Sequence, residues 1–272
     1  MRLSPYRHVL TPAILALAAF VALAQPATAQ PTPPASDVPT VAFEKHTLVN
    51  GLELILHVDR KLPVVHVNQW FHVGSKNEKP GRTGFAHLFE HMMFQGSKNV
   101  EGEYFTVAEK LGANVREGGV NGTTSNDRTN YFATVPSGSL EALLWLESDR
   151  LATLLDVTDL AKLDNQRDVV KNERRQGLEN VPYGRWFEIL FSQMFPMGHP
   201  YSWTVIGSME DLSAATVDDV KEFLRRYYSP NNLSLALPAT STRPRRRPWS
   251  RSTSAASRRD RHWTDPHAGF PP

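Results

Sequence analysis

Apolar and polar residues alternate over several short runs of the chain, and this period of two predicts β-strands. The expected strands are residues 41–47, 52–58, 64–73, 120–125 and 129–135, and another strand begins at residues 233–237. The first two runs flank Asn50-Gly51, a dipeptide that favours the tight turn of a β-hairpin. The two runs after residue 119 are separated by Asn126-Asp127-Arg128 and predict a second strand pair.

Longer segments place apolar residues three and four positions apart, which is the spacing of one helix face. The expected helices are residues 85–94, 106–111, 140–155, 158–178, 183–195 and 217–228. For the third of them, Ser139 is an N-cap candidate, and Leu143, Trp145 and Leu146 are core candidates. Because strands and helices are mixed without strict β–α–β alternation, the predicted fold class is α+β.

The N-terminus has the features of a secretory signal peptide. Basic residues precede an apolar run at residues 13–24, and an Ala27-Thr28-Ala29 cleavage signal follows. The run is shorter than the roughly 20 residues that span a bilayer as a helix, so a retained anchor is the less favoured alternative. We expect a signal peptide at residues 1–29, cut after Ala29 or alternatively after Ala24, and a proline-rich leader at residues 30–39. The mature protein would then be periplasmic or secreted, without a membrane span.

The composition changes abruptly after Leu237. Residues 238–272 contain eight Arg and two Asp and no Leu, Ile, Val or Met. This segment therefore has a net charge of +6, whereas the rest of the chain has a net charge of −4, so that the whole chain sums to +2. The acidic character of residues 1–237 gives no support for a nucleic-acid-binding fold. The segment lacks the apolar periodicity of a packed element and is expected to be disordered. Because the change falls inside an apparent strand, we interpret the segment as a frameshift product that truncates the domain; a tail that binds nucleic acid or membrane is the alternative.

The absence of cysteine restricts the possible chemistry. The chain has ten His and no Cys, so disulfides, thiolate metal sites and cysteine nucleophiles are excluded. Any metal ion would be bound by His, Asp or Glu.

The motif that carries chemistry is His87-Leu88-Phe89-Glu90-His91. On a helix, positions i and i+4 share one face, so His87 and His91 can present two imidazoles to one metal ion, with Glu90 bordering the site. Two imidazoles and a carboxylate from elsewhere leave a fourth zinc position for water, which distinguishes a catalytic zinc site from a structural one. The pattern H-x-x-E-H is the inverzincin signature, in which Glu90 would act as the general base.

Several segments together resemble the pitrilysin family of zinc metallopeptidases, which includes insulin-degrading enzyme and the mitochondrial processing peptidases. The matching segments are residues 84–96, residues 121–125 with Asp127, Thr129 and Tyr131, residues 169–175, residues 179–184 and residues 199–201. The similarity is greatest to the shorter bacterial exported members. It implies an N-terminal catalytic domain at residues 40–237, built as a mixed, mainly antiparallel sheet covered by helices.

The resemblance also implies that Glu173 is the third zinc ligand, which together with the two histidines would hold one Zn²⁺ per chain. By spacing alone, Asp168 and Glu179 are rivals for this role. Gln166 stands seven positions earlier, where relatives often carry a second Glu, and could hydrogen-bond a ligand without adding negative charge.

The strand that contains Asn121, Gly122 and Thr123 resembles the family's substrate-binding edge, where an extended peptide adds as a further strand. The alternative is an internal strand without a ligand. Four other histidines are expected to be structural or to lie at the surface: His57, His66, His72 and His199.

The function implied by the resemblance is a zinc-dependent metalloendopeptidase that hydrolyses extended peptides or proteins in the cell envelope. Members of the family combine two related halves, and the second half supplies an Arg and a Tyr that help to hold the substrate. This chain is therefore expected to need a second homologous half or subunit for full activity. The alternative is a non-catalytic, peptide-binding partner subunit of a two-chain peptidase; the complete set of His87, Glu90, His91 and Glu173 favours the enzyme. A third class, the H-x-x-E-H lyases that act on small thioether sugars, uses a cysteine, which this chain lacks.

Overall fold

The computed structural model describes residues 41–239. The expected signal peptide, the proline-rich leader and the arginine-rich segment from residue 240 onward lie outside the described residues, so these expectations stay predictions.

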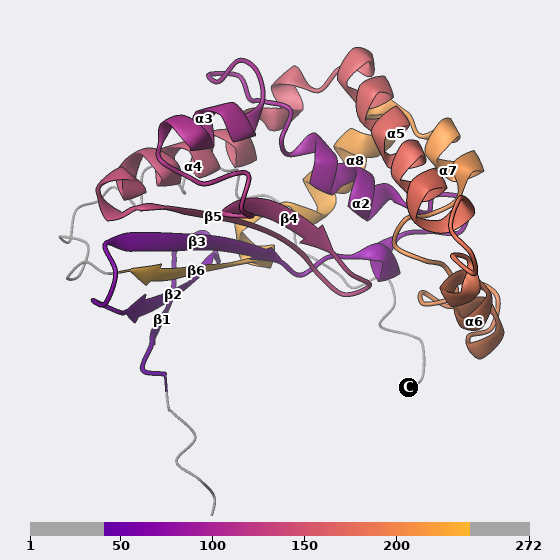
Figure 1. Ribbon diagram of the computed structural model, residues 1–272, viewed down its shortest axis with the longest axis horizontal. Helices are drawn as coiled ribbons and strands as arrows, with labels where there is room; N and C mark the ends of the chain where they lie inside the picture. The colour runs from indigo at the N-terminus through magenta and orange to yellow at the C-terminus, as the bar shows by residue number, and fades with distance from the viewer. Residues whose placement is uncertain (1–40, 240–272) are drawn as a thin grey trace, which may run out of the picture. The chain divides into compact units, whose positions relative to one another are not determined.

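Six strands form one mixed sheet in the order β1-β2-β6-β3-β5-β4 (Figure 1). The strands are β1 (Glu44–Thr47), β2 (Glu53–Val58), β3 (Val64–Phe71), β4 (Val120–Thr124), β5 (Thr129–Pro136) and β6 (Leu233–Ala239). Among the described residues, every neighbouring pair is antiparallel except β2 and β6. The predicted α+β class and the mainly antiparallel sheet are therefore confirmed.

The last strand in sequence, β6, lies between β2 and β3. Its register places Leu235 beside Leu54 of β2, and Ala236 beside Asn68 of β3. The strand continues through Pro238 to Ala239, two residues beyond Leu237, where the change of composition predicts its end.

Helices and helical turns make up most of the remaining described chain. The α-helices are α2 (Phe85–Met92), α3 (Tyr104–Lys110), α4 (Leu140–Val157), α5 (Leu160–Arg174), α6 (Trp186–Met194), α7 (Met209–Ala214) and α8 (Val217–Tyr227). The short turns are the 3₁₀ turns η2 (Ser75–Asn77), η3 (Ser137–Ser139) and η5 (Pro230–Asn232), and the π-helical turn η4 (Arg175–Glu179). Figure 1 shows α3 and α4 over the strands, whereas α2, α5 and α7 gather toward one end of the sheet. No helix within the described residues is long and apolar enough to cross a bilayer.

The core lies between the sheet and the helices. Along β3, Val65, Val67 and Phe71 are at most 1% exposed, whereas Val64 and Trp70 on the other face are 38% and 40% exposed. This alternation follows from the two-residue period of a strand, and it places one face of the sheet against the helices.

Helix α4 packs against this covered face. Leu143 and Leu146 are buried, as predicted, but Trp145 is 41% exposed, so its prediction as a core residue was wrong. Adjacent helix positions point about 100° apart, so one apolar neighbour can face outward. Ser139 stands at the N-cap but its side chain caps nothing, because the 3₁₀ turn η3 leads directly into the helix.

A buried ionic cluster joins α3, α4 and β3. The Arg150 guanidinium lies 2.5 Å from Glu147 and 3.3 Å from the amide oxygen of Gln69. The hydroxyl of Tyr104 donates to the second carboxylate oxygen of Glu147, and its ring centroid lies 4.2 Å from the Arg150 guanidinium carbon. Arg150 and Glu147 are 2% and 3% exposed, so each charge is compensated inside the core.

The helix boundaries differ from the predicted ones by up to four residues, and one helix was not predicted. Helix α5 begins two residues later than expected, because the Asp159 side chain caps it by accepting from the backbone N–H of Lys162 at 2.9 Å. Its last expected turn is the π-helical turn η4. Helix α7 was not predicted, although Ser208 caps it by accepting from the N–H of Asp211, a local signal that could have located it.

Candidate metal centre

Helix α2 places the two motif histidines on one face. The ring centroids of His87 and His91 are 4.8 Å apart and their planes are nearly perpendicular, at 88°. Their Nε2 atoms are 3.3 Å apart. The i, i+4 spacing therefore brings two imidazole nitrogens to one point, as the sequence predicts.

The third member of the cluster comes from α5. Glu173 Oε2 lies 3.5 Å from Nε2 of His87 and 3.5 Å from Nε2 of His91. Ligand atoms of a tetrahedral zinc with bonds of about 2.0–2.1 Å lie about 3.3–3.4 Å apart, so this triangle has the dimensions of one face of such a tetrahedron. Within residues 41–239, these three side chains are the one group of three or more potential ligands that converge closely enough to share an ion.

The two other carboxylates considered for the third position do not join the group. Glu179 lies in η4 and pairs with Arg174 at 3.3 Å. Asp168 is on α5 but does not belong to the convergent cluster among the described residues. Gln166 is buried on the same helix, two turns before Glu173, so a supporting role for it stays a prediction.

The environment of His87 favours the metal-binding form of its imidazole. Burial, helped by the neighbouring His91 ring, lowers the pKa of His87 to about 3. The neutral imidazole with a free lone pair is the form that binds a metal ion. In the described structure the buried Nδ1 of His87 has no hydrogen-bond partner.

Glu90 is directed toward β4. Its Oε2 accepts a hydrogen bond from the Thr124 hydroxyl at 2.6 Å. Burial raises the pKa of Glu90 to about 7, and the charge of Glu173 adds to the rise, whereas Thr124 and Arg128 oppose it. A carboxyl group with a pKa near neutrality can both accept and release a proton, which a general base and acid must do. The contact of Thr124 with Glu90 was not predicted, although Thr124 lies within residues 121–125, the segment that resembles the family's substrate-binding edge.

Gly122 gives Glu90 the room that it occupies. A Cβ atom at Gly122 would lie 2.9 Å from Cγ of Glu90, so any other residue would displace the carboxylate. Of the three residues predicted to bind substrate, Gly122 therefore lies against the glutamate, Asn121 is exposed, and Thr123 donates to the Asn130 side chain on β5 at 2.6 Å.

Strand β4 is the last strand of the sheet, and its outer edge has no strand partner among the described residues. Thr134 donates to Gly119 O and Ser125 donates to Arg128 O, so odd-numbered residues of β4 are hydrogen-bonded to β5. By the alternation of an antiparallel ladder, the backbone groups of Gly122 and Thr124 face outward. Asn121 Oδ1 accepts from the N–H of Gly122 at 2.9 Å.

The remaining predicted histidines have other partners. His57 contacts the Ala42 carbonyl, His66 the Thr134 hydroxyl, His72 the Ser234 hydroxyl, and His199 accepts from the Tyr201 N–H. None of the four belongs to the convergent cluster in the described residues, and their structural or surface role stays a prediction.

Comparison with known proteins is consistent with this site. Residues 54–199 match the family model of the insulinase peptidases, family M16. The zinc protease PqqE of Helicobacter pylori is 35% identical over 191 residues, which cover 70% of this chain and 41% of the relative. An insulin-degrading enzyme homologue of Dictyostelium discoideum is 30% identical over 196 residues, 70% of this chain and 19% of the relative. The chain belongs to the M16 family of zinc proteases, of the insulinase and pitrilysin type.

Solved structures agree on the fold. A protease from Helicobacter pylori superposes with a TM-score of 0.75 at 28% identity, covering 83% of this chain and 53% of that protein. The chain therefore spans about half or less of the length of the relatives that it matches.

Proposed function

We propose that the chain is the zinc-binding domain of a metalloendopeptidase that cleaves extended peptides. The observation that carries the proposal is the triangle of His87 Nε2, His91 Nε2 and Glu173 Oε2, with sides of 3.3–3.5 Å. These three side chains would hold one Zn²⁺ per chain. When bound, zinc supplies a Lewis acid and lowers the pKa of a coordinated water.

Glu90 would move the proton in this reaction. Its Oε2 is engaged by Thr124, so Oε1 would accept the proton of the attacking water and deliver it to the leaving amine. A pKa of about 7 suits both transfers near neutral pH. Because Gly122 has no side chain, the Glu90 carboxylate would have room to lie beside the metal ligands.

The outward backbone groups of Gly122 and Thr124 would bind the substrate by adding it to β4 as a further strand. Main-chain hydrogen bonds of this kind depend little on the side chains of the peptide, so this strand edge would bind extended peptides of varied composition. Asn121 and Thr123, on the same strand β4, would lie next to the bound peptide, which is their predicted role.

We further propose that full activity requires a second homologous half or subunit, because the matched region covers only 41% of the zinc protease PqqE and 53% of the Helicobacter pylori protease structure. Export to the periplasm is proposed from the signal-peptide pattern and from the likeness in fold to the periplasmic protease PqqL of Escherichia coli, which is 22% identical with a TM-score of 0.68. The alternative function remains a peptide-binding partner subunit without catalysis.

The test separates metal binding from catalysis. Zinc content and peptide hydrolysis are measured for the unchanged chain, His91→Ala, Glu173→Ala and Glu90→Gln, with His66→Ala as the matched control. We expect about one zinc per chain, lost in His91→Ala and Glu173→Ala but kept in the control. Glu90→Gln should keep zinc and lose hydrolysis. Zinc retained by Glu173→Ala would contradict the ligand set. Zinc binding without hydrolysis, even with the second half of a relative added, would favour the partner subunit.

A further inference from the structure

The N-terminus of α2 is capped by the carboxyl group of a side chain in the preceding loop. Its N-cap residue, Gly84, has a φ of 86° and no side chain to cap the helix. Instead, Glu78 Oε2 accepts from the N–H of Gly84 at 3.0 Å, and Oε1 accepts from the N–H of Ala86 at 2.7 Å. Glu78 is 3% exposed, and burial raises its pKa to about 8 against the opposing effect of these two N–H groups. The first turn of the helix that carries His87 is thus tied to one buried side chain.

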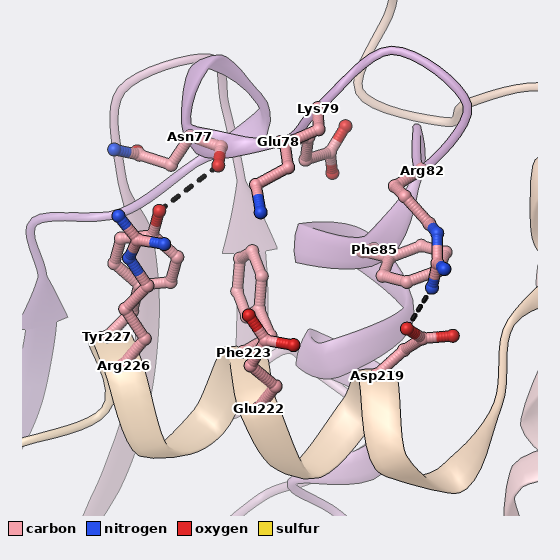
Figure 2. A pocket seen from close by; sticks show the side chains of 10 residues that line it. All are labelled: Asn77, Glu78, Lys79, Arg82, Phe85, Asp219, Glu222, Phe223, Arg226 and Tyr227. Atoms are coloured by element: carbon pink, nitrogen blue, oxygen red, sulfur yellow. Dashed lines mark hydrogen bonds and ion pairs between the residues drawn. The ribbon is translucent and has the colours of Figure 1, made fainter. Parts of the chain in front are cut away.

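The loop that carries Glu78 is itself fixed from the opposite side by α8. A cavity of about 180 Å³ lies between this loop and α8. Figure 2 shows the side chains that line it, with Arg82 paired to Asp219 and the Tyr227 hydroxyl donating to the Asn77 carbonyl. Its lining carries both signs of charge and contains none of the three candidate ligands. The cavity therefore lies where the loop that carries Glu78 packs against α8, and it is not an extension of the metal centre.

The residues just before α2 dock on residues 207–211, which we name the brace. The Asp211 carboxylate accepts from the N–H of Thr83 at 2.9 Å and from its hydroxyl at 2.6 Å. Ser208 N–H donates to the Thr83 hydroxyl at 3.1 Å. A Cβ atom at Gly207 would lie 2.4 Å from the Cα of Gly84, so the two backbones touch and only glycine fits between them.

The same brace holds α5. Arg174, the neighbour of Glu173 in sequence, donates from Nη1 to the Gly207 carbonyl at 2.7 Å. Its guanidinium also pairs with Glu188 at 2.7 Å and Glu179 at 3.3 Å, and the residue is only 6% exposed. Gly207 thus touches the start of α2 through its backbone and the end of α5 through its carbonyl.

We propose that Glu78 and Arg174 are positioning residues. Glu78 fixes the first turn of α2, whose preceding residue Thr83 docks on the brace, and Arg174 fixes the end of α5 on the brace. Together they would set the distance between the two histidines and Glu173. This inference rests on the proposed metal site. Glu173 is the most exposed of the three candidate ligands, with a side chain that is 44% exposed, so its place depends on how α5 is held. Supporting groups around a metal site typically contribute about 10–100-fold in affinity, which is the size of effect expected here.

The experiment titrates the full chain with Co²⁺, whose visible spectrum reports both affinity and coordination geometry. Glu78→Gln places an amide NH₂ against one of the two backbone N–H groups, which then loses its acceptor. Arg174→Lys keeps the positive charge but loses the planar guanidinium that contacts Gly207, Glu188 and Glu179 together. We expect each change to weaken Co²⁺ binding about tenfold and to reduce the intensity of the tetrahedral absorption bands. Asp211→Asn is a milder change within the brace and should give a smaller shift in the same direction.

The matched controls are Glu147→Gln and Arg150→Lys, which alter an equally buried pair whose hydrogen bonds go to Tyr104 and Gln69. These controls should lower the thermal midpoint while leaving Co²⁺ affinity and spectrum within about twofold of the unchanged chain. Unchanged Co²⁺ binding in Glu78→Gln and Arg174→Lys, or an equal loss in the controls, would overturn the positioning role alone. Absence of Co²⁺ and Zn²⁺ binding by the unchanged chain would instead overturn the metal site itself.

Discussion

Helices α2 and α6 have similar lengths and apolar compositions, but their surroundings differ. Six of the eight residues of α2 are buried, including Leu88 and Phe89, which are fully inaccessible. None of the nine residues of α6 is buried, and five of its six large apolar side chains are exposed by 41–62%: Trp186, Phe187, Ile189, Leu190 and Met194. Apolar content therefore does not decide burial; the elements packed around a helix do.

The difference matters for the site. A metal centre needs ligands held to within a fraction of an ångström, and α2 is enclosed by β4, β5, α5 and α8. Helix α6 is attached to α5 through the ion pair of Glu188 with Arg174, while its apolar face has no cover within residues 41–239. Exposed apolar patches of this kind mark interaction sites or favour association.

The largest expected effect compares one phenylalanine from each helix. Phe89 is fully buried and stacks on Phe223 with ring centroids 4.9 Å apart, whereas Phe187 is 45% exposed. Phe89→Ala should lower the free energy of unfolding by about 3–5 kcal/mol, and Phe187→Ala by less than about 1 kcal/mol. Urea unfolding measures both. Equal losses would show that α6 is covered as well as α2.

A medium effect is expected where β4 meets α2. Gly122→Ala would force a Cβ against Cγ of Glu90 and should cost about 1–3 kcal/mol through overpacking. Gly138→Ala is the control, because a Cβ there would meet no atom within 4 Å. Its unfolding free energy should stay the same or rise slightly, since alanine restricts the unfolded chain. If both variants are neutral, the contact between Gly122 and Glu90 does not constrain the helix.

The smallest effect on stability is expected for a charge on α6. Ile189 and Leu160 are both 59% exposed, but Leu160 lies at the start of α5, outside the apolar face of α6. Ile189→Lys should change the free energy of unfolding by less than about 0.5 kcal/mol and reduce self-association in sedimentation velocity. Leu160→Lys should leave association unchanged. A similar reduction in both variants would mean that the α6 face has no special role.

Local sequence signals predicted the parts of the site that depend on local geometry. The i, i+4 spacing placed His87 and His91 together, and the turn at Asn50-Gly51 placed the first hairpin. The role of Glu173 came from the resemblance to the pitrilysin family, and its carboxylate lies with the two histidines in the structure.

Other features depend on contacts between distant parts of the chain. The insertion of β6 between β2 and β3 and the docking of Gly207 on Gly84 leave no local pattern. Apolar periodicity also did not predict that Trp145 faces outward, because it shows which residues share a helix face and not which other elements pack against that face.

X-ray absorption at the zinc edge of the purified, zinc-loaded chain reports the ligands of the metal ion. We expect a four-coordinate site with ligand atoms at about 2.0–2.1 Å and the outer-shell scattering of two imidazoles. Glu173→Ala should lose tight binding, and Glu90→Gln should leave the spectrum unchanged. A site with one or no imidazole, or a spectrum that changes in Glu90→Gln but not in Glu173→Ala, would contradict the assignment of His87, His91 and Glu173 as the ligands.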